Sequence, residues 1–450
     1  MSVKIGNGQG FWGDCISAPE RLVGQVPDLD YLTLEYLAEV SLSIMAIHKE
    51  KNPDLGYARD FIESLKSLLP FWEKGQKFKI ITNAGGLNPK ACARACIELL
   101  EDSLKRPVTV GVVVGDDILH LIDSSSHFDN LDTGDHFDSI HDQLVTANAY
   151  IGAEPIVKAL NAGAEIVIAG RVADPSLTVA ASAAHFGWSF DDYDRLAGAT
   201  VAGHLIECGT QVTGGISTDW LSLPDVANIS FPYVEMEEDG TFVVTKAPKT
   251  GGRVDEMTVK EQLLYELGDP GSYLSPDVTV SFNDITVQEE KENRVRVSGA
   301  RGRTPSDTFK VSVSYRDGFK AEGTLVVWGD KADEKARKAG EMILERLKLS
   351  GCTYDETLIE CLGMGDAVPG LVKGDCEAIE SVLRIVVKDP DKDAVERFTK
   401  EIASLVACGP PGTTGYTTGR PPVREVFGFW PCLVPKGDLE ILSDVIEVNK

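Results

Sequence analysis

The feature that most constrains the fold is the alternation of continuous apolar runs with helical segments in the first half of the chain. The runs FKIIT (78–82), VTVGVVVG (108–115) and AEIVIAG (164–170) are typical of buried strands, and stretches of helical length lie between them. Strands that are apolar on both faces belong to parallel sheets covered by helices. We therefore predict an α/β fold with a doubly wound, largely parallel sheet, and a closed barrel is the structural alternative.

The second half of the chain has a different pattern of polar and apolar residues. From about residue 225, segments such as TFVVTKAP, RVRVSGARG and TFKVSVSYRDG alternate polar and apolar residues and are separated by turn signals. This pattern is typical of antiparallel sheet. We predict two domains: residues 1–224 as an α/β sheet domain with the substrate crevice, and residues 225–450 as an α+β region with antiparallel sheet and a C-terminal strand and helix.

Charge and cysteine content narrow the class of protein. The 450 residues include 70 acids and 44 Lys and Arg, which gives a formal net charge of -26. This excess of negative charge argues against a nucleic-acid or anionic-membrane partner. The 9 cysteines show no disulfide-framework spacing, no apolar run approaches a membrane-spanning length of about 20 residues, and the N-terminus lacks a signal core. We expect a cytoplasmic protein, with self-association left open.

Two strand ends carry the loops that point to ligand binding. In each loop a polar residue precedes proline, Asp174 before Pro175 and Asn88 before Pro89, which predicts Asp174 and Asn88 as helix N-caps. The carboxyl ends of parallel strands are where open α/β sheets bind ligands. A glycine pair lets backbone N–H groups approach an anion, and arginine adds a bidentate donor. The predicted anion-binding residues are Asn83, Gly85, Gly86, Asn88, Arg171 and Asp174, with Asp116 at a further strand end.

Each of these residues also has a structural interpretation. Asp174 would then serve only as a helix cap, Arg171 would pair with a neighbouring acid, and Asp116 would cap a helix. Neither glycine loop matches the dinucleotide-binding or P-loop spacing. The sequence alone therefore leaves the choice between an anion site and local structure open.

Candidate acids and bases cluster in three further segments. In VAGHLIECG (201–209), His204 and Cys208 share one helical face and Glu207 lies beside them. Glu35 and Glu39 lie where a strand meets a helix, and a carboxylate there can act as a general base. Core packing of His204 and Cys208, and capping by the glutamates, are the alternatives. The predicted catalytic residues are His204, Glu207, Glu35 and Asp14, the last of which follows the glycine-rich stretch GNGQGFWG.

The segment 120–144 is rich in histidine and aspartate, but none of its histidine pairs has the i, i+4 spacing of helical metal ligands. We interpret it as a solvated polar loop. A metal-assisted hydrolase that uses this loop is a weaker alternative. We predict no metal ion and no cofactor.

Several long motifs together resemble the acyclic terpene utilisation family. They are GFWGD, DYLTLEYLAE, TNAGGLNP, ANAYIGAEPI, GAEIVIAGRVADPSL and AGHLIECGTQVTGG, and the resemblance covers roughly residues 1 to 430. The motif positions carried over are Asp14, Glu35, Glu39, Asn83, Gly85, Gly86, Asn88, Asp116, Arg171, Asp174, His204 and Glu207. Many family members also end in a small ferredoxin-like domain. Its glycine-rich motif is not found here, so we expect the core form, with any such domain supplied by a separate chain.

The resemblance implies a function in catabolism, since the family is named after bacterial gene clusters that degrade citronellol and geraniol through acyl-CoA intermediates. It suggests an enzyme, of lyase or hydratase type, acting on a branched or isoprenoid carboxylic acid or its acyl-CoA. The expected partner is therefore a small anionic molecule, with no nucleic acid and no membrane. The alternative is a non-catalytic subunit that binds an acyl-CoA or serves as a scaffold in a degradation pathway.

Overall fold

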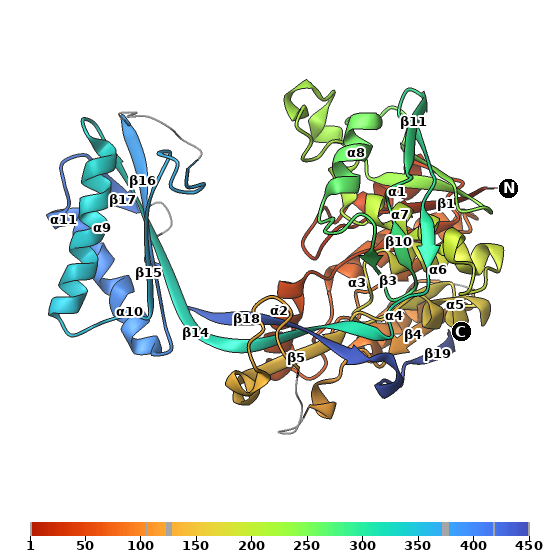
Figure 1. Cartoon of the computed structure of the whole chain (residues 1–450), viewed down its shortest axis with the longest axis horizontal. Coiled ribbons are helices and arrows are strands. Elements are labelled where there is room, and N and C mark those ends of the chain that lie inside the picture. Colours follow the sequence, from red (N-terminus) through yellow and green to blue (C-terminus); the bar gives the residue numbers. More distant parts are fainter. Residues whose placement is uncertain (1, 105, 123–127, 371–377, 417–418, 449–450) are drawn as a thin grey trace. The chain divides into compact units, whose positions relative to one another are not determined.

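The chain folds into two compact units. The structure, a computed structural model, describes residues 2–104, 106–122, 128–370, 378–416 and 419–448. Unit 1 comprises Met1–Ser314 and Phe429–Lys450, and unit 2 comprises Tyr315–Gly428. The chain passes from unit 1 to unit 2 within strand β14 (Thr308–Trp328) and returns within β18 (Arg424–Pro435) (Figure 1). The bounds of these units differ from the division near residue 225 that the pattern of polar and apolar residues suggested.

The largest sheet, in unit 1, has ten strands in the order β11-β12-β8-β7-β1-β2-β3-β6-β4-β19. Its central segment is parallel and consists of β1 (Ser2–Asn7), β2 (Tyr31–Leu34), β3 (Lys79–Thr82), β6 (Ile166–Ile168) and β4 (Val108–Val114). The flanking strands are antiparallel: β7 (Pro232–Glu237), β8 (Phe242–Lys246), β12 (Arg294–Ser298), β11 (Thr286–Lys291) and β19 (Leu442–Val448). The α/β class is confirmed, but the sheet is mixed, because strands of the second half extend it. The doubly wound arrangement stays a prediction.

One face of the parallel segment is covered by the helices that connect its first strands. These are α1 (Ala18–Gln25), α2 (Glu39–Lys51), α3 (Asp60–Glu73) and α4 (Pro89–Ser103). Helix α3 buries Phe61, Leu65, Leu68 and Trp72, a spacing of three and four residues that places them on one side of the helix. They belong to one hydrophobic cluster with strand residues such as Leu32, Ile80 and Ile166, which are neighbours in register. This packing fixes the ends of the parallel strands.

Three helices from the middle of the chain also pack on this sheet. Helix α5 (Glu154–Asn161) contacts β4 and β6, and α6 (Ser176–Phe186) contacts β1, β2 and β3. Helix α7 (Tyr193–Ile206) packs against α6 and β7. Residues Leu196–Ile206 of α7 are all buried, and many of them are small. The helix therefore lies deep in unit 1, and its C-terminal end brings His204 and Glu207 close to the ends of the parallel strands.

The remaining elements of unit 1 were harder to predict. β5 (Leu144–Ala149) pairs with β14. A small sheet combines β9 (Tyr273–Leu274), β10 (Thr279–Ser281) and β13 (Arg301–Arg303), and α8 (Glu256–Leu264) contacts α7. β14 runs unbroken through YRDG, a sequence that suggested a turn between two strands. Its pairing with β16 from Phe319 onward continues the strand past this signal.

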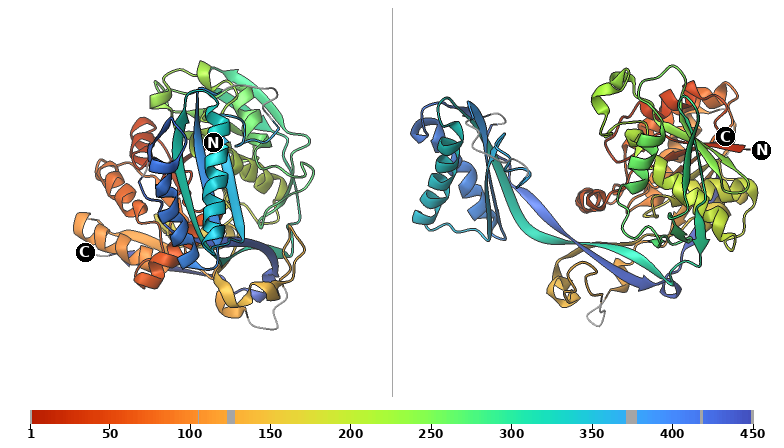
Figure 2. Two further views of the ribbon diagram at one scale, coloured as in Figure 1. Left: turned by 90° about the vertical axis from the view of Figure 1, so that its left-hand side faces the viewer. Right: turned by 45° about the horizontal axis from the view of Figure 1, so that its top comes forward.

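Unit 2 combines antiparallel strands with helices on one face, and its strands belong to a six-stranded sheet in which β18 and β5 also pair with β14. Its sheet order is β15-β16-β14-β17, and along the chain the elements are β14, α9 (Ala332–Leu349), β15 (Glu356–Leu362), β16 (Glu380–Asp389), α10 (Lys392–Glu401), α11 (Leu405–Cys408) and β17 (Thr413–Tyr416). This is the β-α-β-β-α-β arrangement of ferredoxin-like units, and the second part of β14 is its first strand. Figure 2 shows α9 and α10 on the same face of this sheet, where Leu325, Ile343, Leu383 and Phe398 form its core.

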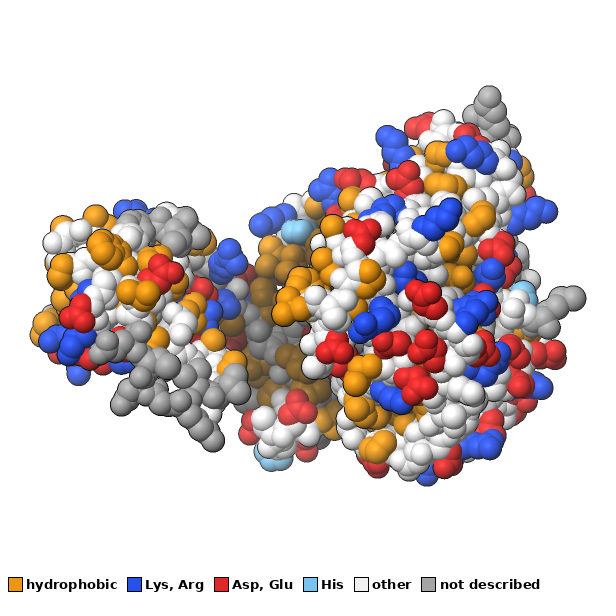
Figure 3. All heavy atoms as spheres, turned by 90° about the horizontal axis from the view of Figure 1, so that it is seen from above, with side chains coloured by type: hydrophobic (Ala, Val, Ile, Leu, Met, Phe, Trp, Pro, Cys, Tyr) orange, Lys and Arg blue, Asp and Glu red, His pale blue; other side chains and the backbone are white. Residues whose placement is uncertain are grey.

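The surface carries charges of both signs. On the face of unit 1 drawn in Figure 3, acidic and basic side chains are interspersed. The excess of negative charge is therefore not gathered into a single patch on that face. In the part of the chain that the structure describes, no helix combines the length and apolar character needed to cross a membrane.

Candidate functional site: an acidic pocket at the strand ends

A pocket of about 650 Å³ lies in unit 1 at the carboxyl ends of the parallel strands. Its walls come from the loops that follow β1, β2 and β6, from the C-terminal end of α7, and from the segment after α8 together with the start of β14. The charged residues that line it are Asp14, Glu35, Glu39, Asp174, Glu207, Glu266 and Lys310. Among the described residues of this lining, Lys310 is the only lysine or arginine. The pocket is therefore acidic.

Glu35 follows β2 directly and is held rigidly at the pocket wall. Its Oε1 accepts hydrogen bonds from the side-chain amide of Asn83 and from the backbone N–H of Leu37. Asn83 follows β3, the neighbouring parallel strand, and its Oδ1 accepts from the Tyr36 N–H at 2.7 Å. Oε2 of Glu35 is buried and has no hydrogen-bond partner among the described residues. Burial, reinforced by the nearby charge of Asp174, holds the pKa of Glu35 well above its usual range.

Arg171 lies just behind the pocket lining, with its side chain only 2% exposed. Nη1 donates to the Leu37 carbonyl at 2.6 Å and Nη2 donates to Asp174 Oδ1 at 2.6 Å. Its Nε has no hydrogen-bond partner among the described residues. Burial alone would lower the pKa of Arg171, but the charge of Asp174 and its other acidic neighbours raise it, so the guanidinium stays charged. Both terminal nitrogens of Arg171 already donate hydrogen bonds within the protein. An anion-binding role for Arg171 stays a prediction.

Asp174 does not cap the following helix as the sequence predicted. Pro175 occupies the N-cap position of α6, and no side-chain capping hydrogen bond is formed there. The carboxylate of Asp174 instead accepts a hydrogen bond from Arg171. Leaving a buried guanidinium without an anionic partner costs more free energy than leaving a helix without a side-chain cap. Burial raises the pKa of Asp174, although Arg171 opposes this effect. Asp174 thereby places a paired carboxylate in the pocket lining.

Tyr150 contacts Arg171 and two residues of the pocket lining, Glu39 and Lys310. Its ring lies 3.9 Å from the Arg171 guanidinium carbon and 5.0 Å from Lys310 Nζ, each measured to the ring centroid. Its hydroxyl donates to Glu39 Oε1 at 2.8 Å. Burial of Glu39 would raise its pKa, but the hydrogen bonds to its carboxylate, including that from Tyr150, and the charge of Arg171 lower it. Tyr150 therefore helps to place both an ionised carboxylate and the lysine of the pocket.

Glu207 and His204 approach the pocket from the end of α7. His204 Nδ1 lies 3.4 Å from Glu207 Oε1, and both side chains are at least nine-tenths buried. Burial is the main cause that lowers the pKa of His204, so the imidazole is neutral near pH 7. Burial, together with the charges of Asp174 and Glu266, holds the pKa of Glu207 well above its usual range. Cys208 also lines the pocket, and burial raises the pKa of its thiol, which makes a thiolate nucleophile unfavourable.

Asp116 follows β4 and lies behind the pocket, outside its lining. Its Oδ2 accepts from the Arg171 backbone N–H at 2.8 Å and from the Asn148 side chain at 2.8 Å. Burial raises the pKa of Asp116 to about 6. The carboxylate thus joins the loop after β6 to the end of β5, which is a structural role.

The loop after β3 also acts through packing. A side chain at Gly85 would meet the carbonyl oxygen of Ala169 at the end of β6, and one at Gly86 would meet Met45 of α2. Asn88 caps α4, as predicted, by accepting from the Ala91 N–H at 3.3 Å. Gly85, Gly86 and Asn88 do not line the pocket, so an anion at their amides stays a prediction.

Asp14 shapes the loop that forms one rim of the pocket. Its two carboxylate oxygens accept from the backbone N–H groups of Gly10 at 3.0 Å and Cys15 at 2.7 Å. Both oxygens of Asp14 therefore support the loop, and Asp14 also lines the pocket.

None of the described residues of the histidine-rich segment 120–144 lines this pocket. His136 contacts Asp129 at 3.1 Å and His141 contacts Asp142 at 3.3 Å, with both aspartates exposed; His127 lies outside the described residues. Within the described ranges, no three His, Cys, Asp or Glu side chains are grouped so that they could hold one metal ion.

The structure brings four predicted site residues to one pocket, Asp14, Glu35, Asp174 and Glu207, together with Glu39, a motif position that was considered as a candidate base. Asn83, Arg171 and His204 support them from behind. The sequence reasoning missed Tyr150, Glu266 and Lys310. Tyr150 lies in ANAYIGAEPI, one of the motifs that carried the family resemblance, whereas Glu266 and Lys310 come from the β-rich half and had no local signal.

The fold and the pocket define an α/β protein with buried carboxyl groups gathered at the carboxyl ends of parallel strands. A family model described as "acyclic terpene utilisation family protein AtuA" matches residues 3–444, so the chain belongs to the acyclic terpene utilisation family. The resemblance of the motifs is thereby confirmed over nearly the whole chain. No curated protein and no solved structure matches the chain.

Proposed function

We propose that the protein is a catabolic enzyme that adds water to, or removes water from, a branched or isoprenoid carboxylic acid or its acyl-CoA. The observation that carries this proposal is a pair of buried carboxyl groups, Glu35 and Glu207, in one pocket. Each has a buried Oε2 with no hydrogen-bond partner among the described residues. Membership of a family named for acyclic terpene utilisation supports the substrate class.

The environment of the two glutamates suits proton transfer. Burial raises the pKa of both, and the charge of Asp174 raises it further in each case. Both interact with the charge of Asp174, and we propose that one of them acts in its protonated form and the other in its ionised form. An acid and a base of the same residue type can then operate in the same pocket near neutral pH.

In the hydration direction, the ionised glutamate takes a proton from water as the water oxygen bonds to the β carbon of an α,β-unsaturated acid. The electron pair of the double bond moves towards the carboxyl or thioester oxygen, and the protonated glutamate delivers its proton to the α carbon. The reverse sequence removes water. In each turnover one glutamate gains a proton and the other loses one, so the pair ends with its protonation exchanged and is reset through solvent.

Lys310 is the proposed anchor for the anionic end of the substrate. No ion pair joins its ammonium group to a carboxylate in the described structure, and its Nζ is held near the rings of Tyr150 and Phe429. An ammonium there would attract a carboxylate and stabilise developing negative charge on its oxygen. Protonated Glu35 or Glu207 lowers the negative charge of the pocket, which reduces the repulsion that an anionic substrate meets.

The test is a turnover assay with α,β-unsaturated isoprenoid acids and their CoA esters in ¹⁸O-labelled water. We expect incorporation of the label into a hydroxy acid by the wild type, and a loss of at least about 100-fold in kcat for Glu35→Gln and for Glu207→Gln. Glu154→Gln, at an exposed ion pair with Lys158, is the matched control and should retain full activity. Binding of these compounds without turnover would instead support the non-catalytic subunit, and equal activity of all variants would remove the roles of the two glutamates.

A further inference from the structure

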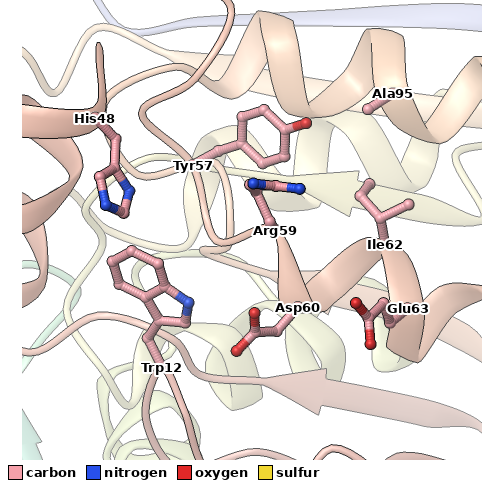
Figure 4. Close-up of a pocket in the computed structure, with 8 residues that line it drawn as sticks. All are labelled: Trp12, His48, Tyr57, Arg59, Asp60, Ile62, Glu63 and Ala95. Atoms are coloured by element: carbon pink, nitrogen blue, oxygen red, sulfur yellow. The ribbon is translucent and has the colours of Figure 1, made fainter. Parts of the chain in front are cut away.

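A second pocket, of about 440 Å³, lies in unit 1 beside the loop that follows β1. Its lining includes Trp12 from that loop, His48 from α2, and Tyr57 and Arg59 from the segment between α2 and α3 (Figure 4). The proposed hydration chemistry uses none of these residues. Its volume lies within the range of about 300–1,000 Å³ that is usual for small-molecule sites.

Aromatic rings form much of the wall of this second pocket. The rings of Trp12 and His48 meet edge to face, with centroids 5.8 Å apart, and Figure 4 shows the Tyr57 ring across from them with the Arg59 guanidinium beside it. The rings of Trp12, His48 and Tyr57 are each partly exposed. Partly exposed aromatic rings around one space suit a planar ligand, because a flat ring can stack on them over a large area.

Arg59 gives the pocket a cation that is free to bind an anion. Arginines elsewhere in the described chain, such as Arg94, Arg294 and Arg337, have carboxylate partners within 3.0 Å. Arg59 has no ion pair or side-chain hydrogen bond within the described residues, although Asp60 and Glu63 line the same pocket. An unpaired guanidinium beside aromatic rings matches the geometry of a phosphate group attached to a ring system.

We propose that this pocket binds a nucleotide. The base stacks on the aromatic rings, the phosphate binds Arg59, and Asp60 and Glu63 accept hydrogen bonds from the ribose hydroxyls or from an exocyclic amino group. A simple aromatic carboxylate would use the rings and Arg59 but would leave both acids without a donor. The combination of rings, one free arginine and two acceptors therefore favours a nucleotide over other flat anions.

The nucleotide could be free or could be the end of a larger carrier molecule. The loop after β1 separates the two pockets, since Phe11 lines the acidic pocket and Trp12 lines the aromatic one. This inference does not depend on the proposed hydration chemistry, because it concerns binding at residues outside the acidic pocket.

Isothermal titration calorimetry of the full chain tests the inference, with adenosine monophosphate, adenosine, inorganic phosphate and coenzyme A as separate probes. We expect adenosine monophosphate to bind more tightly than adenosine, and inorganic phosphate to bind only weakly. Arg59→Ala should weaken binding of adenosine monophosphate by at least about tenfold and remove its advantage over adenosine. Trp12→Leu should weaken both. Tighter binding of coenzyme A than of adenosine monophosphate would identify the larger carrier, and the reverse would identify the free nucleotide.

Arg94→Ala is the matched control, because Arg94 is an exposed arginine of α4 that does not line the aromatic pocket. It should bind adenosine monophosphate as the wild type does. Circular dichroism spectra confirm that each variant is folded. The inference is overturned by the absence of binding of both adenosine monophosphate and coenzyme A at millimolar concentration, or by equal affinity in the wild type and Arg59→Ala.

Discussion

At the scale of single residues, the unusual feature of this protein is the number of buried carboxyl groups that meet at one end of a sheet. Glu35, Asp116, Asp174 and Glu207 are all more than half buried, and burial raises the pKa of each. Removing a carboxylate from water is costly unless it is paired or protonated. Such an arrangement reduces the stability of the folded chain near neutral pH, which is a common property of sites that transfer protons.

Asp116 allows this cost to be measured. Its pKa rises from an ordinary value of 3.8 to about 6 in the folded chain. Between these two pH values the folded state binds more protons than the unfolded state, so the free energy of unfolding falls as pH rises through this window. We expect Asp116→Asn to remove the part of this fall that Asp116 causes. The variant should gain up to about 3 kcal/mol relative to the wild type at pH 7.5 and little at pH 4.

The substitution keeps the local hydrogen bonds, since one oxygen of Asp116 accepts both of them and an asparagine oxygen can take its place. Urea denaturation of both proteins at the two pH values gives the comparison. Asp132→Asn, at an exposed aspartate that is not among the charged neighbours of Asp116, is the control and should not change the pH dependence. A stability difference for Asp116→Asn that is the same at both pH values would contradict the argument.

The positions of these residues could be predicted from the sequence better than their partners. Glu35, Asn83, Asp116 and Arg171 each follow a parallel strand, and strands of one direction end at one edge, so their proximity follows from the strand pattern. The strand pattern does not show which of the side chains near the strand ends pair with one another. Asp174 was predicted to cap a helix, but it pairs with Arg171. The reason for this pairing is the burial of the Arg171 guanidinium, which is visible only in the folded chain.

At the scale of secondary-structure elements, the position of α7 depends on a very close approach to the turn between β7 and β8. A side chain at Gly198 of α7 would overlap the backbone of Gly240 in that turn. This approach places the C-terminal end of α7, and with it Glu207, at the acidic pocket. The glycine therefore acts through packing, since a glycine inside a helix otherwise reduces helix stability.

We expect Gly198→Ala to destabilise the chain by about 1–3 kcal/mol, because the added methyl group must displace backbone atoms. Gly24→Ala in α1 is the matched control. There the methyl group would touch the Phe71 ring at ordinary contact distance, and the gain in helix propensity should stabilise the chain by up to about 1 kcal/mol. Thermal unfolding of the two variants gives the comparison, and a loss of stability no larger for Gly198→Ala than for Gly24→Ala would show that α7 does not depend on this contact.

The elements that were predicted least well from the sequence are strands whose partner strands lie far away along the chain. β19 joins the sheet beside β4 although about 330 residues separate them, a figure that follows from the bounds of the two strands. β14 continues through a turn-like sequence because its partner β16 pairs with it from Phe319 to Trp328. Local periodicity predicts that such segments are strands, but their neighbours are set by the whole fold.

At the scale of the whole molecule, the acidic pocket belongs to unit 1 alone but draws on both halves of the sequence. Glu266 and Lys310 come from the region after residue 225, and every residue that lines the pocket lies before residue 315. A division of the chain at residue 225 would separate Lys310 from Glu35. The compact units therefore give a better guide to which part of the chain can be removed without disturbing the pocket.

We predict that unit 1 folds and keeps both pockets when residues 315–428 are replaced by a short glycine-serine linker. β14 and β18 pair with each other, so the two ends to be joined lie on adjacent strands. The hydrophobic core of unit 2 is made by its own residues, such as Leu325, Ile343 and Phe398, and the main cluster of unit 1 contains none of them. The shortened chain should unfold cooperatively and bind adenosine monophosphate with the affinity of the full chain. A chain that is unfolded by circular dichroism would show that unit 1 needs unit 2 to fold, whereas a folded chain that has lost turnover would assign unit 2 a part in the reaction.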